Sequence, residues 1–489
     1  MFNISYFKTS SKAPIKDTPL ITKKHKVQMM SHETDEPLTP AGRLFIQPET
    51  NIVVLCCLAT KQPLRIEAIK SVIANSMLAK HPRLSSILVV GKNGREYWRK
   101  TEIDMERHVI IRHESIEGAT DDEDAANLYM ADLAVSTPLE TDKPLWEVHL
   151  LTSHKCAVIR AHHALGDGIS MLSFFIAMCR RADDPAAVPV ITPVVNPRSN
   201  GRNGVGVMMW RLLKVVWFTV VFVFDFIARV LWVRDETTVV SGGAGVELWP
   251  RKLATARFLI DDMKVVKKSI PKTTINDVLL GVISLGLSKY LDKRSPKLAL
   301  REGLRMTGVA MVNLRPQAGH QDLIKMMQDR STGWGNKFGM LLLPTYYYRT
   351  GSDPLEYLKT AKTMIDQKKS SLEGFFSYKF GYLVMALMGA KYASLLNYKI
   401  LCNTTFTISN MVGPKEKVTF ADHPVDYMKT TSTSLPHGIT MHMVSYDGTA
   451  YMQLLVAKDL VPDPEVLAKC LEDALLEMKE AAVATVKHK

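Results

Sequence analysis

The sequence lacks most of the short motifs that identify a nucleotide, metal or nucleic-acid site. It contains no P-loop, no G-x-S-x-G nucleophile motif and no H-E-x-x-H metal motif. No RNP pattern, zinc-finger spacing or Lys/Arg block is present either, so the formal net charge of +13 does not indicate a nucleic-acid partner. A positive charge of this size also suits an anionic membrane surface or a phosphate-bearing substrate.

Cysteine is sparse, and no C-x-x-C pair occurs among the 489 residues. The six cysteines lie in apolar stretches, which predicts reduced core residues in a protein that faces the cytosol. They are Cys56, Cys57, Cys156, Cys179, Cys402 and Cys470.

The N-terminus lacks the apolar core of a secretory signal. We therefore expect residues 1–36 to form a flexible extension. A targeting presequence is the alternative, because Asp17 is the only acidic residue among the first thirty.

The chain also lacks a clean membrane-spanning run. Its most apolar stretch lies at about residues 205–233. The longest run without a charged residue in that stretch is 215–224, which is shorter than the ~20 residues of a clean span. Four charged residues interrupt it: Arg211, Lys214, Asp225 and Arg229. Three tryptophans suit a headgroup region: Trp210, Trp217 and Trp232. A segment that lies in the membrane plane or re-enters it fits at least as well as a span, and a helix packed on the protein is the alternative.

Apolar periodicity switches between strand-like and helix-like stretches in both halves, which predicts an α/β fold. The length favours two domains around a shared cleft. We expect an N-terminal domain over residues 37–185, a linker with the apolar segment over 186–250, and a C-terminal domain over 251–489. Two β-rich runs in the first domain, "PLWEVHLL" and "KCAVIRA", predict a hairpin, so the residues after it leave a strand.

Those residues, "HHALGDG" from His162 to Gly168, are the densest reactive cluster. Neighbouring side chains on a strand point to opposite faces, so His162 and His163 are not expected to share a metal ion. One imidazole can act as a general base, because its pKa lies close to neutral pH. Asp167, within a Gly-Asp-Gly turn, either orients that ring or fixes the turn.

Further blocks occur in a specific order along the chain. They are "PLTPAGRLF" (37–45), "HPRL" (81–84), "PLWEVHLL" (144–151), "HHALGDG" (162–168), "NDVLLG" (276–281), "VNLRP" (312–316), "GNKFG" (335–339) and "SNMVGP" (409–414). From Pro37 onward the sequence resembles the plant wax ester synthase/diacylglycerol acyltransferase family. That family lies within the CoA-dependent acyltransferases, which include chloramphenicol acetyltransferase and peptide-synthetase condensation domains. H-H-x-x-x-D-G alone indicates only the superfamily, whereas the whole set is specific.

The resemblance implies two chloramphenicol-acetyltransferase-like domains with a central substrate tunnel. It implies that His163 is the catalytic base, that His162 supports it, and that Asp167 pairs with Arg315 of "VNLRP". Asn276 of the N-D block either lies near the reacting carbonyl or caps its helix. Two weaker candidates, expected at turns or strand ends, are Asn313 and Asn336.

The resemblance further implies a fatty acyl-CoA donor and a long-chain alcohol or diacylglycerol acceptor, with acyl-CoA as a co-substrate and no cofactor or metal. The product is then a wax ester or triacylglycerol. We expect a protein on the endoplasmic reticulum membrane with its active site facing the cytosol, or alternatively on the plasma membrane. Two rival functions are a condensation-type enzyme that forms amides and a catalytically silent lipid-surface protein.

Overall fold

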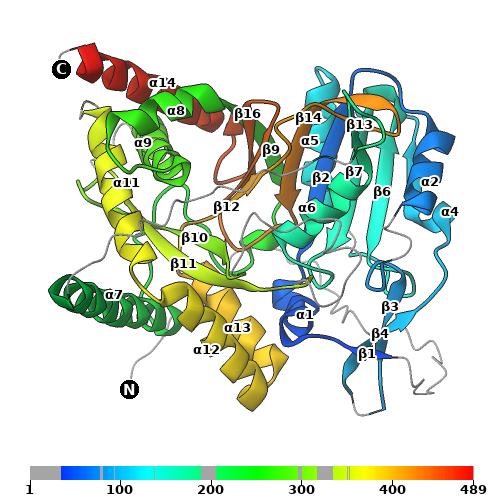
Figure 1. Cartoon of the computed structure of the whole chain (residues 1–489), viewed down its shortest axis with the longest axis horizontal. Coiled ribbons are helices and arrows are strands. Elements are labelled where there is room, and N and C mark those ends of the chain that lie inside the picture. Colours follow the sequence, from blue (N-terminus) through cyan, green and yellow to red (C-terminus); the bar gives the residue numbers. More distant parts are fainter. Residues whose placement is uncertain are drawn as a thin grey trace, which may run out of the picture.

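The computed structural model describes residues 35–487, except 77–80, 93, 137, 188, 190–204, 296–299, 316–333, 350 and 352. Most of the expected extension, residues 1–34, therefore lies outside the described residues. Two large β-sheets stand side by side, and most helices lie on their outer faces (Figure 1). The α/β class expected from the sequence is confirmed.

The first sheet has seven strands in the order β5-β6-β7-β2-β14-β13-β8. These strands are β2 (Val53–Thr60), β5 (Val109–Arg112), β6 (Trp146–Leu151), β7 (Cys156–His162), β8 (Cys179–Arg181), β13 (Val418–Phe420) and β14 (His423–Ser432). The accompanying helices are α2 (Ile66–Asn75), α4 (Met105–His108), α5 (Asp122–Leu133) and α6 (Gly168–Ala177). Every residue of β7 is buried, which explains its apolar residues from Cys156 to Ile159, and the buried Arg160 within it pairs with Glu147 of β6 at 2.8 Å. The predicted hairpin is present: β6 and β7 are antiparallel and joined by the short helix η2 (Thr152–His154).

The second sheet has six strands in the order β11-β10-β12-β15-β16-β9. They are β9 (Arg251–Leu259), β10 (Arg305–Asn313), β11 (Phe338–Tyr346), β12 (Phe406–Val412), β15 (Ile439–Tyr446) and β16 (Thr449–Ala457). Its outer helices, on the left in Figure 1, are α8 (Ile260–Ser269), α9 (Ile275–Arg294), α11 (Pro354–Lys369) and α14 (Pro464–Lys487). Thr274 and Asp277 form a capping box at the start of α9, which fixes where that helix begins.

The sheets do not follow the expected domain boundary at residue 251. Strands β13 and β14 come from the C-terminal part of the chain but complete the first sheet, where β14 pairs with β2 and β13 pairs with β8. The boundary is wrong for residues 418–432, because a buried β2 edge would leave its backbone N–H and C=O groups unpaired. The two domains are therefore joined by the linker and also by β13 and β14, which extend from the C-terminal part of the chain into the first sheet.

The apolar segment of the linker forms one helix, α7 (Val205–Leu231). Its last turns pack on the protein through Phe226, Arg229 and Val230, whereas its first part is exposed. By length and composition, it is the one helix among the described residues that could cross a membrane. The packed-helix alternative therefore holds for the C-terminal half of α7, where Thr219 accepts from the N–H of Leu372 and Lys368 lies over the Phe222 ring, and not for the exposed first part.

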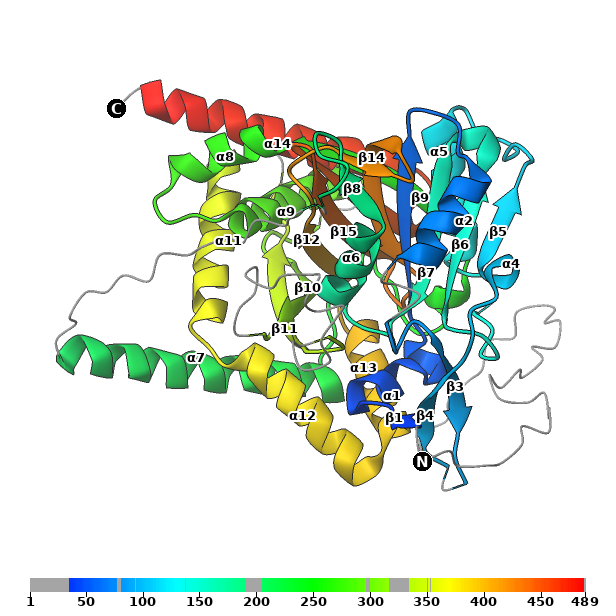
Figure 2. The same ribbon diagram turned by 45° about the vertical axis from the view of Figure 1, so that its right-hand side comes forward.

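Beside α7 lies a helical hairpin made of α12 (Glu373–Met388) and α13 (Ala390–Cys402), which sequence reasoning did not anticipate (Figure 2). The chain turns between the two helices at Gly389, whose φ of 86° favours glycine. Helix α12 approaches β11 so closely that a Cβ atom at Gly339 would overlap the carbonyl of Gly374. The smaller elements are α1 (Pro40–Phe45), η1 (Pro48–Thr50), η3 (Val246–Leu248) and a three-stranded sheet of β1 (Glu36–Pro37), β4 (Glu96–Lys100) and β3 (Ser86–Val90).

Candidate active site

The "HHALGDG" motif links the end of β7 to the start of α6, between the two sheets. Strand β7 ends at His162, and Asp167 is the N-cap of α6, where its Oδ1 accepts from the backbone N–H of Ser170 at 3.2 Å. A carboxylate at this position satisfies a helix N–H group and favours the positive end of the helix dipole. Asp167 therefore has a structural role, as the cap of α6, that does not depend on what the two histidines do.

The expected pair of Asp167 and Arg315 is formed. Arg315 Nη1 donates to Asp167 Oδ2 at 2.6 Å, and the two side chains are only 2% and 7% exposed, respectively. The same nitrogen donates to Oδ1 of Asn313 at 3.0 Å, so Asn313 helps to orient the guanidinium group. This buried pair joins α6 beside the first sheet to the end of β10 in the second.

The pair also holds the segment that precedes β11. Arg315 Nη2 donates to the carbonyl of Gly335 at 2.5 Å, and the backbone N–H of Lys337 donates to Asp167 Oδ2 at 3.0 Å. The indole N–H of Trp334 donates to the carbonyl of Leu165 at 2.9 Å. Residues 334–337 are thus fixed against the histidine motif.

Asn336, in the middle of that segment, makes two hydrogen bonds with His163. Its Nδ2 donates to the His163 carbonyl at 2.8 Å, which orients the amide so that Oδ1 faces His163 Nδ1 at 3.1 Å. An oxygen there requires a proton on Nδ1, so the lone pair of the neutral ring is on Nε2. Among the described residues, no side chain or backbone group donates a hydrogen bond to Nε2. Asn336 therefore prepares Nε2 to accept a proton.

Burial lowers the pKa of His163, and the negative charge of Asp167 opposes that effect. The ring also stacks on Phe45 of α1, with ring centroids 4.1 Å apart. A neutral imidazole with a free Nε2 is the form that a general base needs.

The ring of His162 makes different hydrogen bonds from the ring of His163. Its Nε2 lies 2.6 Å from Oδ1 of Asn51, and its Nδ1 accepts from the N–H of Ala164 at 3.1 Å. Burial lowers its pKa to about 3. Both ring nitrogens are occupied, so His162 has no lone pair left for a substrate and supports the turn.

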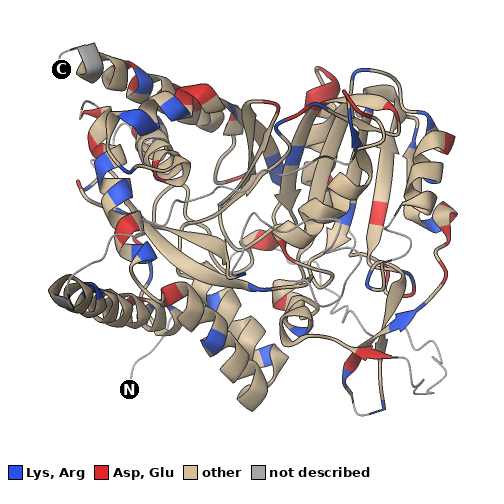
Figure 3. Ribbon diagram, viewed as in Figure 1, with Lys and Arg blue, Asp and Glu red and all other residues tan. Residues whose placement is uncertain are grey.

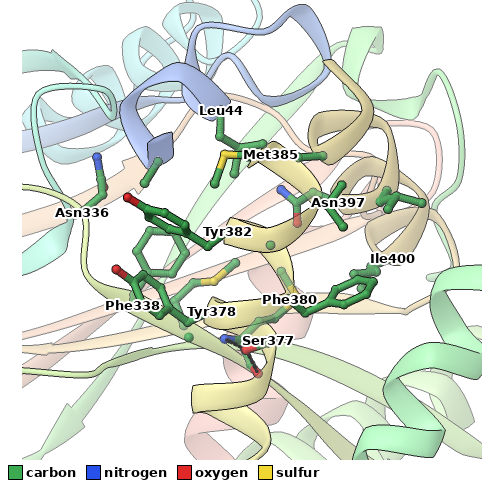
Figure 4. Close-up of a pocket in the computed structure, with 18 of the residues that line it drawn as sticks. Leu44, Asn336, Phe338, Ser377, Tyr378, Phe380, Tyr382, Met385, Asn397 and Ile400 are labelled. Atoms are coloured by element: carbon green, nitrogen blue, oxygen red, sulfur yellow. Dashed lines mark hydrogen bonds between the residues drawn. The ribbon is translucent and has the colours of Figure 1, made fainter. Parts of the chain in front are cut away.

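An apolar pocket, drawn in Figure 4, reaches the residues that surround His163. Three residues that contact the His163 ring or its backbone also line this pocket: Phe45, Asn336 and Phe338. From there the pocket runs between α1, α12, α13 and the buried end of α7, and it encloses about 1010 Å³ of atom-free space, its open mouth included. Cavities of this kind suit an elongated apolar ligand.

Asn276 does not cap its helix, because Thr274 occupies the N-cap position of α9. Its Oδ1 instead accepts from Nδ2 of Asn410 at 2.8 Å, which brings the N-D block to the end of β12. Its other expected position, near the reacting carbonyl, remains a prediction. Sequence reasoning underrated Asn336, although "GNKFG" was among the blocks that carry the resemblance.

Comparison with known proteins decides the family. A family model described as the wax ester synthase/diacylglycerol acyltransferase catalytic domain matches residues 58–279, and the WS/DGAT C-terminal domain matches 334–479. Wax ester synthase/diacylglycerol acyltransferase 11 of Arabidopsis thaliana is 33% identical over 92% of this chain and 96% of its own length. Wax ester synthase/diacylglycerol acyltransferase 5 of the same plant is 34% identical over 91% and 94%.

The chain belongs to the wax ester synthase/diacylglycerol acyltransferase family. A solved wax ester synthase/diacylglycerol acyltransferase from Marinobacter aquaeolei VT8 has the same fold, with a TM-score of 0.57 at 16% identity over 91% of this chain and 99% of that one. The first condensation domain of the calcium-dependent antibiotic synthetase also has a TM-score of 0.57, at 14% identity over 92% and 96%. Both the expected family and the expected two-domain fold of the CoA-dependent acyltransferases are confirmed.

We predict that Asp167→Asn and Arg315→Met each lower the melting temperature, because each leaves a buried polar partner unpaired. Breaking such a pair from one side typically costs about 3–5 kcal/mol. In a double-mutant cycle followed by thermal unfolding, the double variant should lose clearly less than the sum of the two single losses. Strictly additive losses would show that the two side chains are not coupled.

We also predict that Asn336→Asp moves the acid limb of the kcat/KM profile to higher pH. The base must be neutral, so activity falls as pH drops through the His163 pKa, which burial places below the ordinary value of 6.5. A carboxylate beside Nδ1 favours the protonated ring and should raise that pKa by about 1–3 units. Asn336→Leu, which has no charge, should lower kcat without this upward shift. An unchanged acid limb in Asn336→Asp would contradict the contact with His163.

Proposed function

We propose that the protein transfers a fatty acyl group from acyl-CoA to the hydroxyl of a long-chain alcohol or diacylglycerol, forming a wax ester or triacylglycerol. The observation that carries the proposal is the neutral His163, whose Nδ1 is held by Asn336 so that its lone pair lies on Nε2, and whose neighbours Phe45, Asn336 and Phe338 line an apolar pocket. Family membership supports ester formation over the amide-forming rival. Acyl-CoA is a co-substrate, and the reaction needs no cofactor.

In this mechanism, His163 Nε2 takes the hydroxyl proton while the hydroxyl oxygen attacks the thioester carbonyl. The tetrahedral oxyanion then collapses, the C–S bond breaks, and the protonated His163 returns the proton to the CoA thiolate. No acyl-enzyme forms in this mechanism, because the acceptor hydroxyl itself attacks the thioester and His163 only moves the proton. Asn276, held by Asn410, is the candidate for a contact to the reacting carbonyl.

We expect His163→Ala to lower kcat by about 10²–10⁴, because general-base catalysis is lost, while acyl-CoA binding is retained. His162→Ala should cost less in kcat and more in melting temperature. Product analysis by thin-layer chromatography, in yeast without its own neutral-lipid synthesis and fed a fatty alcohol, identifies the reaction. Wax ester or triacylglycerol supports the proposal. An amide product, no product, or full activity in His163→Ala contradicts it.

We further propose that the protein attaches to the cytosolic face of the endoplasmic reticulum through residues 205–233. The exposed part of α7 carries Trp210 and Trp217 on the surface, and Trp232 follows its end. Its C-terminal end is anchored to the protein, which suits a helix in the membrane plane better than a span that leaves the protein. The plasma membrane is the alternative site.

Replacing Trp210 and Trp217 with Glu should release the protein from microsomal membranes, because charged side chains oppose interfacial burial. The matched control is Leu248→Glu, at a position that is exposed outside α7. Sedimentation of membranes checks the outcome, and carbonate extraction separates an in-plane helix from a span. A wild-type protein that never sediments with membranes would refute the attachment.

A further inference from the structure

The α12–α13 hairpin has two apolar faces. On α12, Tyr378, Gly381, Tyr382 and Met385 line the pocket, at the spacing of one helix face. On α13, the pocket face is formed by residues 393, 396, 397, 400 and 401. Figure 4 shows labelled side chains of both helices around the cavity.

The outer faces of the two helices are also apolar. Leu383 is 55% exposed and Leu387 is 76% exposed. The other exposed apolar side chains of the hairpin are Phe375, Tyr382, Met388, Tyr392 and Leu395. Exposed apolar side chains gathered in this number mark a surface that contacts apolar material, so water alone is a poor environment for this hairpin.

The exposed charges of helices α7, α12 and α13 have one sign. The exposed charged residues of α7, α12 and α13 are Arg211, Lys214, Lys379, Lys391 and Lys399. The two acidic residues of these helices are neutralised: Asp225 pairs with Arg305 at 2.7 Å, and the fully buried Glu373 pairs with Lys368 at 2.7 Å. Figure 3 shows these helices mostly uncharged, with basic segments, whereas α8, α11 and α14 carry both signs. An apolar surface edged with cations complements an anionic lipid leaflet.

The membrane-facing helices and the pocket wall are therefore the same elements. Tyr382 lines the pocket and is itself 43% exposed, so the pocket wall reaches the outer surface on α12. The inner end of the pocket contacts His163 through Phe45 and Asn336. An alkyl chain can thus remain in apolar surroundings from the leaflet to the base.

Resting on the proposed function, we infer that the α12–α13 hairpin is a second membrane-contacting element, and that the uncharged acceptor lipid enters sideways from the leaflet between α12 and α13. An alcohol or diacylglycerol resides in the membrane, whereas acyl-CoA carries charged phosphates and reaches the enzyme from water. The route suits the acceptor, because it avoids transferring a long alkyl chain through water. Helix α7 attaches the protein, and the hairpin admits the substrate.

The test compares two acceptors with the same palmitoyl-CoA donor: hexadecanol held in phosphatidylcholine/phosphatidylserine vesicles, and hexanol dissolved in water with the same vesicles present. In Leu383→Glu/Leu387→Glu, the ratio of the hexadecanol rate to the hexanol rate should fall on the order of tenfold, because two Leu side chains no longer enter the leaflet. The matched control is Leu476→Glu on α14, which is 45% exposed on another face and should keep the wild-type ratio. Thermal unfolding shows whether each variant is folded.

A second variant tests the pocket directly and keeps the outer face intact. Gly381 lines the pocket and a Cβ atom there meets no atom within 4 Å, so Gly381→Ala is accommodated and Gly381→Leu adds bulk at the pocket wall. The ratio should fall further in Gly381→Leu than in Gly381→Ala.

A wild-type ratio in both the Leu383→Glu/Leu387→Glu variant and Gly381→Leu overturns the lateral route while leaving the esterification itself established. If the lipid-free protein sediments as a dimer that the two Glu residues dissociate, a second copy covers the hairpin, and the route is also overturned. If the wild-type protein esterifies neither alcohol, the proposed function fails first and the route with it.

Discussion

The buried ion pair of Asp167 and Arg315 is the contact on which the active site depends. Desolvation makes such a pair expensive, so it contributes more to geometry than to net stability. Here it joins the start of α6 to the end of β10, and the same two side chains hold residues 335 and 337. Asn336 lies between these anchored residues, and through it the pair determines where the His163 ring stands.

The state of His163 follows from opposing effects. Burial against Phe45 lowers its pKa, whereas the nearby charge of Asp167 and, to a smaller extent, the hydrogen bond with Asn336 raise it. Asn336 also fixes the proton on Nδ1 and so sets the tautomer of the neutral ring. The apolar surroundings and the uncharged Asn336 together keep the imidazole neutral and available as a base. A carboxylate bound directly to Nδ1 would favour the protonated ring, so less of the neutral base would be present at low pH.

The apolar pocket and the apolar surface have one cause in the fold. Helix α12 packs on β11 where Gly339 faces Gly374, and the space that α7, α12 and α13 leave beside that contact is the cavity. Exposed leucines, tryptophans and phenylalanines on their outer faces would reduce solubility in water. The same residues gain free energy when they enter a lipid leaflet, so this surface and the pocket serve one class of substrate.

The sequence by itself determined the α/β class, the strand–motif–helix order around His163 and the family. These features depend on local periodicity or on blocks of adjacent residues. The pairing of Asp167 with Arg315 was an implication of the family resemblance, and the structure confirms it. Apolar periodicity indicates which residues are buried but not which elements they pack against. The sequence therefore does not predict that β13 and β14 join the first sheet. The contact between His163 and Asn336 joins residues 173 positions apart, and the α12–α13 pocket is lined by residues from separate segments that range from Ala41 to Leu435. Only the tertiary structure decided these features, because hydrogen bonds and cavities form between surfaces that meet after the chain has folded.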